Sequence, residues 1–291
     1  MGNLKEIRTR ISSIESTQKI TSSMKLVSAA KLRRAQSAIQ YLRPYSEKLT
    51  EILHNLSASA GSMEEMPLFE SRNPDKVVIV VITSNKGLCG AFNANIIKAV
   101  NHLVEEKYAA QHAAGNVHLI CIGKKGYEQL HTSYPILQHN EALLDNPEFT
   151  EIAGICDQLT EKFLNHEIDK VDIVYNQFLN AATQRITMEE FLPLSNLEEE
   201  ASTTNNDYII EPSPEEVLTE LIPKILRNQL YKTLCDSIAS EHGARMISMT
   251  KATDNATEIL RDLRLKYNNA RQSSITNELI EIVSGAEALK G

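Results

Sequence analysis

The residues best placed to do chemistry lie in VVIVVITSNKGLCGAFNANI, the stretch from Val77 to Ile96. An apolar β-branched run, a glycine turn and a helical pattern are typical of loops that hold a phosphate. A dinucleotide fingerprint needs GxGxxG, and a P-loop lysine follows its last glycine, so neither motif is met. The stretch therefore predicts a structural turn at Lys86, Gly87 and Gly90. A nucleotide-binding Rossmann-type protein that uses the Gly87–Gly90 loop is the alternative.

The other residue types that could bind a metal or attack a substrate do not gather into motifs. The eight histidines are scattered singly, and neither HExxH nor GxSxG occurs. The four cysteines lie far apart without a CxxC pair, which favours reduced thiols over a zinc site or a disulfide framework. The stretches MEEM, NLEEEAS and ASTTNND (residues 201–207) are typical of polar loops. We therefore expect no catalytic group, no metal and no cofactor.

Both ends of the chain carry helical patterns. Near the start, apolar residues recur at intervals of three and four, at Leu4, Ile7, Ile11 and Ile14. No glycine or proline interrupts this pattern before Pro44. Near the other end, the SPEE stretch that begins at Ser213 is a capping signature, with proline at the first helical position. We expect an N-terminal helix within residues 1–60 and a C-terminal helix within 213–291.

These two helices should form a long antiparallel coiled coil, because neither could bury its apolar face alone. If residue 58 lies beside residue 213, the numbers of paired residues sum to about 270. Pro44 would then lie level with Pro223, and residues 269–291 would have no partner. That last segment carries an apolar stripe made by Ile275, Leu279, Ile282, Val283 and Leu289. An exposed stripe of this kind indicates a protein that is part of an assembly.

Residues 61–212 predict a small Rossmann-like domain. Its apolar segments KVVIVVIT, VHLICIG and VDIVYNQF alternate with helical patterns near residues 90–111 and 150–166. This alternation is typical of a mainly parallel sheet with crossover helices. The expected fold class is therefore α/β, with a coiled coil of the two terminal helices added to the sheet domain.

Charge and hydropathy narrow the classes of partner. Residues 1–60 carry ten Lys or Arg against four Glu, so this end of the chain is basic. A coiled-coil nucleic-acid binder would need such a surface, but aromatic residues are few and no recognised motif accompanies the charge. No run of 18 apolar residues occurs, and the first residues do not form a secretory signal. We expect no nucleic acid, and membrane association only through a complex.

Several stretches of the chain closely resemble the gamma subunit family of F-type ATP synthases. ITNELIEIVSGAEA, from Ile275 to Ala288, matches the signature of that family. KEIRTRISSIESTQKITSSMKLVSAAKLRRAQ, GLCGAFN, SEHGARMISMTKATDNA and YNNARQSSIT agree with the family in the same order. The resemblance therefore covers almost the whole chain.

The resemblance implies a central-stalk rotor subunit that is not itself catalytic. Its paired helices would stand inside the alpha3-beta3 hexamer, and its globular part would sit on the epsilon subunit and the membrane c-ring. Proton-driven rotation of the c-ring would turn this shaft and drive the catalytic sites of the beta subunits. The expected location is the cytoplasmic face of the bacterial inner membrane.

The resemblance also implies contact residues. Met24 matches the rotor methionine that faces an acidic loop of beta, and the neighbouring Lys25 suits that partner. Arg245 matches the arginine grouped with that methionine. Further matches to polar residues that contact beta are Arg271, Gln272, Thr276, Glu278 and Glu281. The alternatives are that Met24 is a seam residue and Glu281 an ordinary exposed carboxylate.

The sequence also shows polar segments and departures that bear on its resemblance to that family. Small polar residues dominate Ser16–Ser23 and Arg271–Asn277, which favours breakable contacts over tight apolar locking. The usual Asp-Arg before GLCG is replaced by Asn85 and Lys86, so the positive charge stays and the carboxylate is lost. An inserted cysteine pair like that of the chloroplast regulatory loop is absent, which argues against thiol switching.

Overall fold

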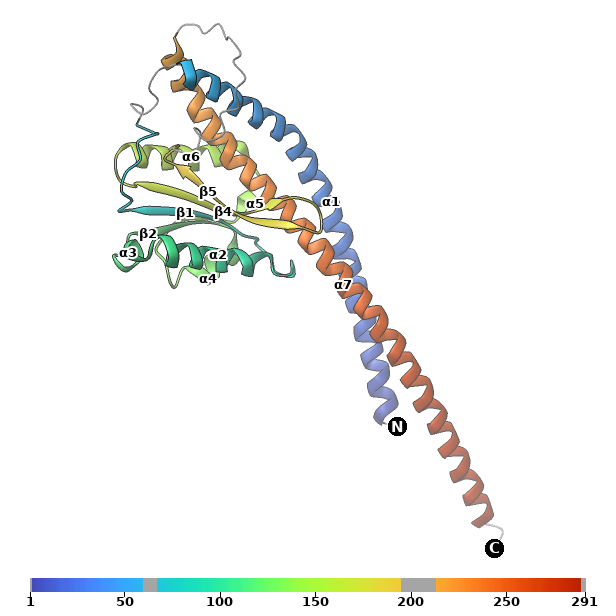
Figure 1. Cartoon of the computed structure of the whole chain (residues 1–291). Helices are drawn as coiled ribbons and strands as arrows, with labels where there is room; N and C mark the ends of the chain where they lie inside the picture. The colour runs from blue at the N-terminus through green and yellow to red at the C-terminus, as the bar shows by residue number, and fades with distance from the viewer. Residues whose placement is uncertain (1, 60–66, 195–212, 289–291) are drawn as a thin grey trace. The chain divides into compact units, whose positions relative to one another are not determined.

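The computed structural model describes residues 2–59, 67–194 and 213–288 (Figure 1). It contains two long helices, α1 (Gly2–Ser59) and α7 (Pro214–Ala288), and between them a sheet with shorter helices. The chain divides into two compact units, one made by Met1–Ser28 with Met246–Gly291 and the other by Ala29–Arg245. The expected fold class is confirmed.

The division into residues 1–60, 61–212 and 213–291 stays a prediction. Both predicted junctions fall beside residues 60–66 and 195–212, which lie outside the described part of the chain. The three polar loop stretches predicted above, MEEM, NLEEEAS and ASTTNND, also lie wholly outside the described residues.

Helix α7 begins where its capping signature predicts. The Ser213 hydroxyl accepts a hydrogen bond from the backbone N–H of Glu216 at 3.3 Å, and the Ser213 carbonyl accepts one from Val217 at 3.2 Å. The cap thus satisfies one of the N–H groups that the first turn of a helix leaves without a partner.

Replacing Ser213 with alanine is expected to lower the free energy of unfolding by about 1 kcal/mol, because the N–H of Glu216 loses its acceptor. Urea titration of the full-length chain measures this difference. Ser213→Asp serves as the matched control, since aspartate caps as well as serine and should retain wild-type stability. Equal losses in the two variants would contradict the capping function.

In the unit that holds the start of α1 and the end of α7, the two helices run antiparallel. Thr253 donates a hydrogen bond to Thr21 at 2.9 Å, and Gln18 donates one to Thr257 at 2.7 Å. Further along, Arg264 pairs with Glu15 at 2.7 Å. The antiparallel pairing is confirmed, but the partners of α1 lie about one turn or more further along α7 than the predicted register places them.

The same displacement occurs in the larger unit, where Asn228 donates a hydrogen bond to Ser46. Pro44 is therefore level with about residue 230 of α7, and the prediction that it lies level with Pro223 is wrong. The prediction assumed that the ends of the two helices face each other. Helix ends are set by caps and breakers, however, while register is set by the side chains that pack between the helices.

The sheet has five strands in the order β3-β2-β1-β4-β5. The three predicted strands are present as β1 (Val77–Ile82), β2 (Val117–Ile122) and β4 (Lys170–Phe178), and they are mutually parallel. The predicted helices between them are α2 (Phe92–Lys107) with α3 (Ala109–Ala113), and α6 (Phe149–Leu164). Two short helices complete this unit, α4 (Lys124–Leu130) and α5 (Ala142–Asp145).

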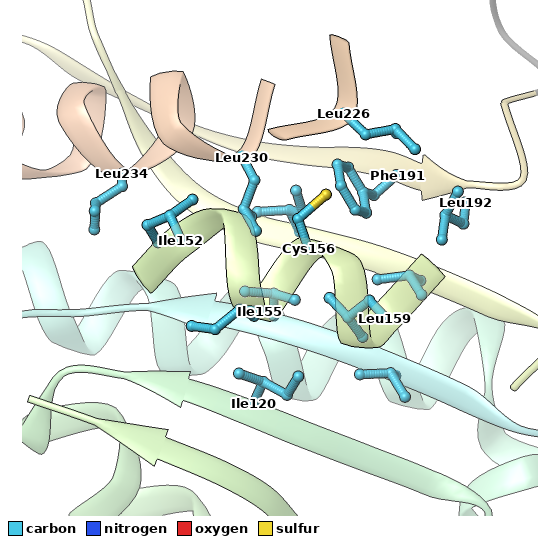
Figure 2. Close-up of a cluster of buried hydrophobic side chains, with 14 of the residues drawn as sticks. Ile120, Ile152, Ile155, Cys156, Leu159, Phe191, Leu192, Leu226, Leu230 and Leu234 are labelled. Carbon is cyan, nitrogen blue, oxygen red and sulfur yellow. The ribbon is translucent and has the colours of Figure 1, made fainter. Parts of the chain in front are cut away.

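The central strand β1 is buried on both faces, which explains its unbroken apolar sequence. Val78, Val80 and Ile82 pack on the side of α6 and α7, and the alternate residues pack on the side of α2. Figure 2 shows Leu226, Leu230 and Leu234 of α7 over α6 and the sheet. These leucines recur every four residues and are fully buried, so one face of α7 belongs to the core of the sheet domain.

Sequence patterns missed the two outer strands. β3 (Ile136–Asn140) pairs with β2 in parallel, and β5 (Gln184–Leu192) pairs with β4 antiparallel. β5 contains two adjacent glutamates, Glu189 and Glu190, which hide its strand pattern. The fold accommodates both, because Tyr175 donates a hydrogen bond to Glu189 and Lys170 pairs with Glu190, each at 2.6 Å.

Candidate functional site

The loop with Gly87 and Gly90 joins the carboxyl end of β1 to α2, as predicted. Gly90 has φ of 63°, in the left-handed region that glycine tolerates best, and Leu88 shares this conformation at the same angle. Because β1 lies between β2 and β4, this loop is at the point where chain connections leave the sheet in opposite directions. Doubly wound sheets bind their ligands at such a point.

Asparagine side chains hold the loop in shape. Asn93 in α2 accepts a hydrogen bond from the N–H of Ser84 at 2.9 Å and donates one to the Ser84 hydroxyl at 2.7 Å. Asn85 donates to the carbonyl of Glu141 at 2.8 Å and accepts from the N–H of Lys124 at 3.1 Å. A carboxylate in place of Asn85 could not donate the first of these bonds. The hydrogen bonds of Asn85 therefore explain why an asparagine fits this position.

Arg245 of α7 is bonded to the backbone of this loop. Its guanidinium donates to the carbonyl of Lys86 at 2.7 Å and to that of Gly87 at 3.3 Å, and it forms an ion pair with Glu241. Phosphate loops present backbone N–H groups to an anion, whereas this loop presents carbonyl oxygens to a cation. The geometry therefore favours a helix anchor over the nucleotide-binding alternative.

The ionisable groups around Arg245 are buried and their pKa values are displaced. Burial raises the pKa of the Glu241 carboxyl, against the opposing effect of Arg245. Burial, together with the positive charges of Arg245 and Lys31, lowers the pKa of His242 to about 4. His242 is therefore neutral at physiological pH, and Glu241 serves as the counter-ion of Arg245.

The four cysteines are free and buried. Burial raises the pKa of Cys121, Cys156 and Cys235 to about 12, and it raises the pKa of Cys89 as well. A thiol with a raised pKa is a poor nucleophile. Within residues 2–59, 67–194 and 213–288, the side chains form no cluster of histidine, cysteine, aspartate and glutamate suited to a metal ion.

The predicted contact residues differ in how exposed their side chains are. Met24 and Lys25 are half-buried on α1, and five predicted residues are exposed on the end of α7, namely Arg271, Gln272, Thr276, Glu278 and Glu281. Arg245, in contrast, is 7% exposed and makes its hydrogen bonds inside the larger unit. Sequence spacing shows Glu241 and Arg245 four residues apart, but it does not show that both are buried.

The end of α7 presents apolar as well as polar side chains to solvent. All side chains described from residue 275 to 287 are exposed, including Ile275, Leu279, Ile280, Ile282 and Val283. This agrees with the expected segment without a partner, although Leu289 lies outside the described residues. None of the described helices is both long and apolar enough to cross a membrane.

These features define a class of protein in which a coiled coil is joined to a doubly wound sheet, and its own helix bonds to the loop where such sheets bind ligands. Comparison with known proteins then specifies the family. A family model described as ATP synthase matches residues 3–289. Curated proteins called ATP synthase gamma chain are similar over their full length and that of this chain, with 54% identity in Flavobacterium johnsoniae and 42% in Chlorobaculum tepidum. The chain belongs to the ATP synthase gamma chain family.

Solved structures agree with this assignment. A chain of the central stalk and c-ring structure of the Tetrahymena thermophila mitochondrial ATP synthase is 25% identical, with a TM-score of 0.58 over 80% of this chain and 99% of that one. A chain of the Euglena gracilis mitochondrial ATP synthase, at 19% identity, has a TM-score of 0.68 over 99% of this chain and 95% of its own. The second comparison supports the fold alone.

Proposed function

We propose that the protein is the rotor of an ATP synthase and couples rotation of a membrane c-ring to ATP synthesis on beta subunits. It performs no catalysis itself. The observation that carries this proposal is the end of α7, where a helix of this family exposes apolar side chains over residues 275–287. Such a surface requires a neighbour that covers it.

We assign one set of partners to the end of α7 and another to the sheet domain. The end of α7 would enter the alpha3-beta3 hexamer, and the sheet domain would contact the epsilon subunit and the c-ring. The Tetrahymena relative comes from a structure of a central stalk with its c-ring, which supports this assignment. Through these partners the protein would be held at the cytoplasmic face of the bacterial inner membrane.

We also propose that the exposed polar residues of α7 form the breakable contacts with the beta subunits. Arg271, Gln272 and Glu278 are exposed and can exchange partners without removing a large apolar surface from a pocket. In the other polar segment, Gln18 and Thr21 form hydrogen bonds within the coiled coil. That segment therefore helps to hold α1 and α7 together. It would also contribute to contacts with beta, as proposed for the nearby Met24.

Assembly with alpha and beta subunits tests the proposed function. Co-expression with alpha and beta from the same source is expected to give a complex with one copy of this chain per three alpha-beta pairs. ATP hydrolysis should be restored relative to a control expression without the chain. Absence of the chain from the purified hexamer, or hydrolysis that does not depend on it, would refute the proposal.

Calorimetry distinguishes the rotor from the nucleotide-binding alternative. Titration of ATP or NAD into the full-length chain alone is expected to give no binding heat, because the carbonyl groups of Lys86 and Gly87 face Arg245. Saturable heat that disappears after Lys86→Ala would favour the alternative.

A further inference from the structure

Helix α7 is fastened to the carboxyl end of β4 by a buried hydrogen bond. The Ser240 hydroxyl donates to the carbonyl of Asn176 at 3.0 Å, and both residues are buried. Asn176 lies two residues before the end of β4, so this bond ties the helix to the last part of the strand. A hydrogen bond between buried groups is directional, unlike the apolar contacts of Leu226, Leu230 and Leu234.

One turn further along, α7 approaches the turn between β4 and β5 closely. A Cβ atom at Gly243 would lie 2.9 Å from the carbonyl oxygen of Ala181 and 3.4 Å from its Cα. The turn is held in one shape, because the Asn180 side chain accepts hydrogen bonds from the N–H groups of Ala182 at 2.9 Å and Thr183 at 2.8 Å. Glycine is therefore needed for this approach.

A single cation joins the same strand end to both long helices. Arg43 of α1 donates a hydrogen bond to the carbonyl of Phe178 at 3.0 Å and pairs with Asp236 of α7 at 3.5 Å. The Asp236 side chain is fully buried, and burial raises its pKa, so Arg43 partly offsets a costly buried charge. These contacts are independent of Arg245 and lie beside a different strand.

We propose that Arg43, Ser240 and Gly243 form the joint that transmits torque between the sheet domain and the shaft. The inference rests on the proposed rotor function. The apolar core holds α7 against the sheet through contacts that have no preferred direction, and the joint adds directional contacts that set the angle of the helix at the carboxyl end of β4. The three residues are positioning residues, since they touch no reacting group.

The test uses the assembled, membrane-embedded complex and compares proton pumping with ATP hydrolysis. Gly243→Ala should leave the rate of ATP hydrolysis near that of wild type, while the ratio of protons pumped to ATP hydrolysed falls about twofold or more. Gly154→Ala is the matched control, because Gly154 is an exposed glycine of α6 and an added Cβ meets open space there. Its ratio should equal that of wild type.

Ser240→Ala provides a second test that adds no bulk. Loss of its hydrogen bond should raise the population of the undocked turn about fivefold, measured as faster hydrogen exchange of the amides in residues 177–184. Its pumping ratio should fall in the same direction as that of Gly243→Ala. If Gly243→Ala fails to assemble, the ratio and the exchange rate of Ser240→Ala decide the question.

The outcomes separate this inference from the rotor proposal. A wild-type chain that fails to assemble or to pump refutes the rotor function itself. Variants that assemble, hydrolyse and pump with the wild-type ratio overturn the joint while leaving the rotor function intact. A reduced ratio with retained hydrolysis supports the joint, because simple loss of folded protein would lower both rates together.

Discussion

Replacing Arg245 with methionine is expected to lower the free energy of unfolding of the full-length chain by about 3–5 kcal/mol. The substitution leaves the Glu241 carboxylate buried without its counter-ion, and it removes the donor to the carbonyls of Lys86 and Gly87. Arg245 and Glu241 are each only 7% exposed, so water cannot replace the lost partner. Urea titration measures the loss.

Two further variants separate the cost of the stranded charge from other effects. In Arg245→Met with Glu241→Leu, no charge is stranded, and we expect most of the lost stability to return. Arg227→Met breaks a bidentate ion pair with Asp157 on the surface and should cost at most about 1 kcal/mol. If Arg245→Met costs no more than Arg227→Met, the anchor is not a buried ion pair in solution.

Replacing His242 with leucine is expected to reduce the loss of stability in acid. The folded chain holds the pKa of His242 at about 4, chiefly because the ring is buried and because Arg245 is positively charged. The unfolded chain binds this proton near pH 6.5, so the contribution of neutral His242 is complete above that pH and is lost as the pH falls through 4. Between pH 7.5 and pH 5 this loss amounts to about 2 kcal/mol.

Urea titrations at the two pH values test this expectation. Wild type should lose about 2 kcal/mol more than His242→Leu on acidification, while the two chains differ little at pH 7.5. The difference between the chains is the informative quantity, because raised pKa values of Glu241 and Asp236 act in the opposite direction in both. Identical pH dependence would show that His242 is not buried as a neutral ring.

Local sequence patterns predicted the parts of the fold that have strong local signals. The Ser213 cap and the unbroken run before Pro44 specify the long helices, and the apolar residues of β1, β2 and β4 specify strands buried on two faces. The edge strands β3 and β5 are covered less and carry polar residues, so their patterns resemble loops. The predicted register of the two long helices was wrong because register depends on contacts between residues far apart in the sequence. Thr21 and Thr253, for example, are 232 positions apart.

The candidate site was predictable in outline only. The missing glycines argued against a nucleotide fingerprint, but they gave no hint that Arg245 would bond to the backbone of this loop. That arrangement brings together residues such as Lys86 and Arg245, 159 positions apart. Gly243 likewise looks like an unfavourable residue in a helix. The structure explains it, because a Cβ atom there would come too close to the backbone of Ala181.

The burial of all four cysteines has a practical consequence for observing motion directly. Because the native thiols are shielded and hard to ionise, a maleimide dye should react far faster with a cysteine introduced at an exposed position than with any of them. Glu161 of α6 is one such position, on the sheet domain and away from the joint residues. In the proposed rotor, a fluorophore or bead attached there would report single rotational steps without prior removal of this chain's natural cysteines.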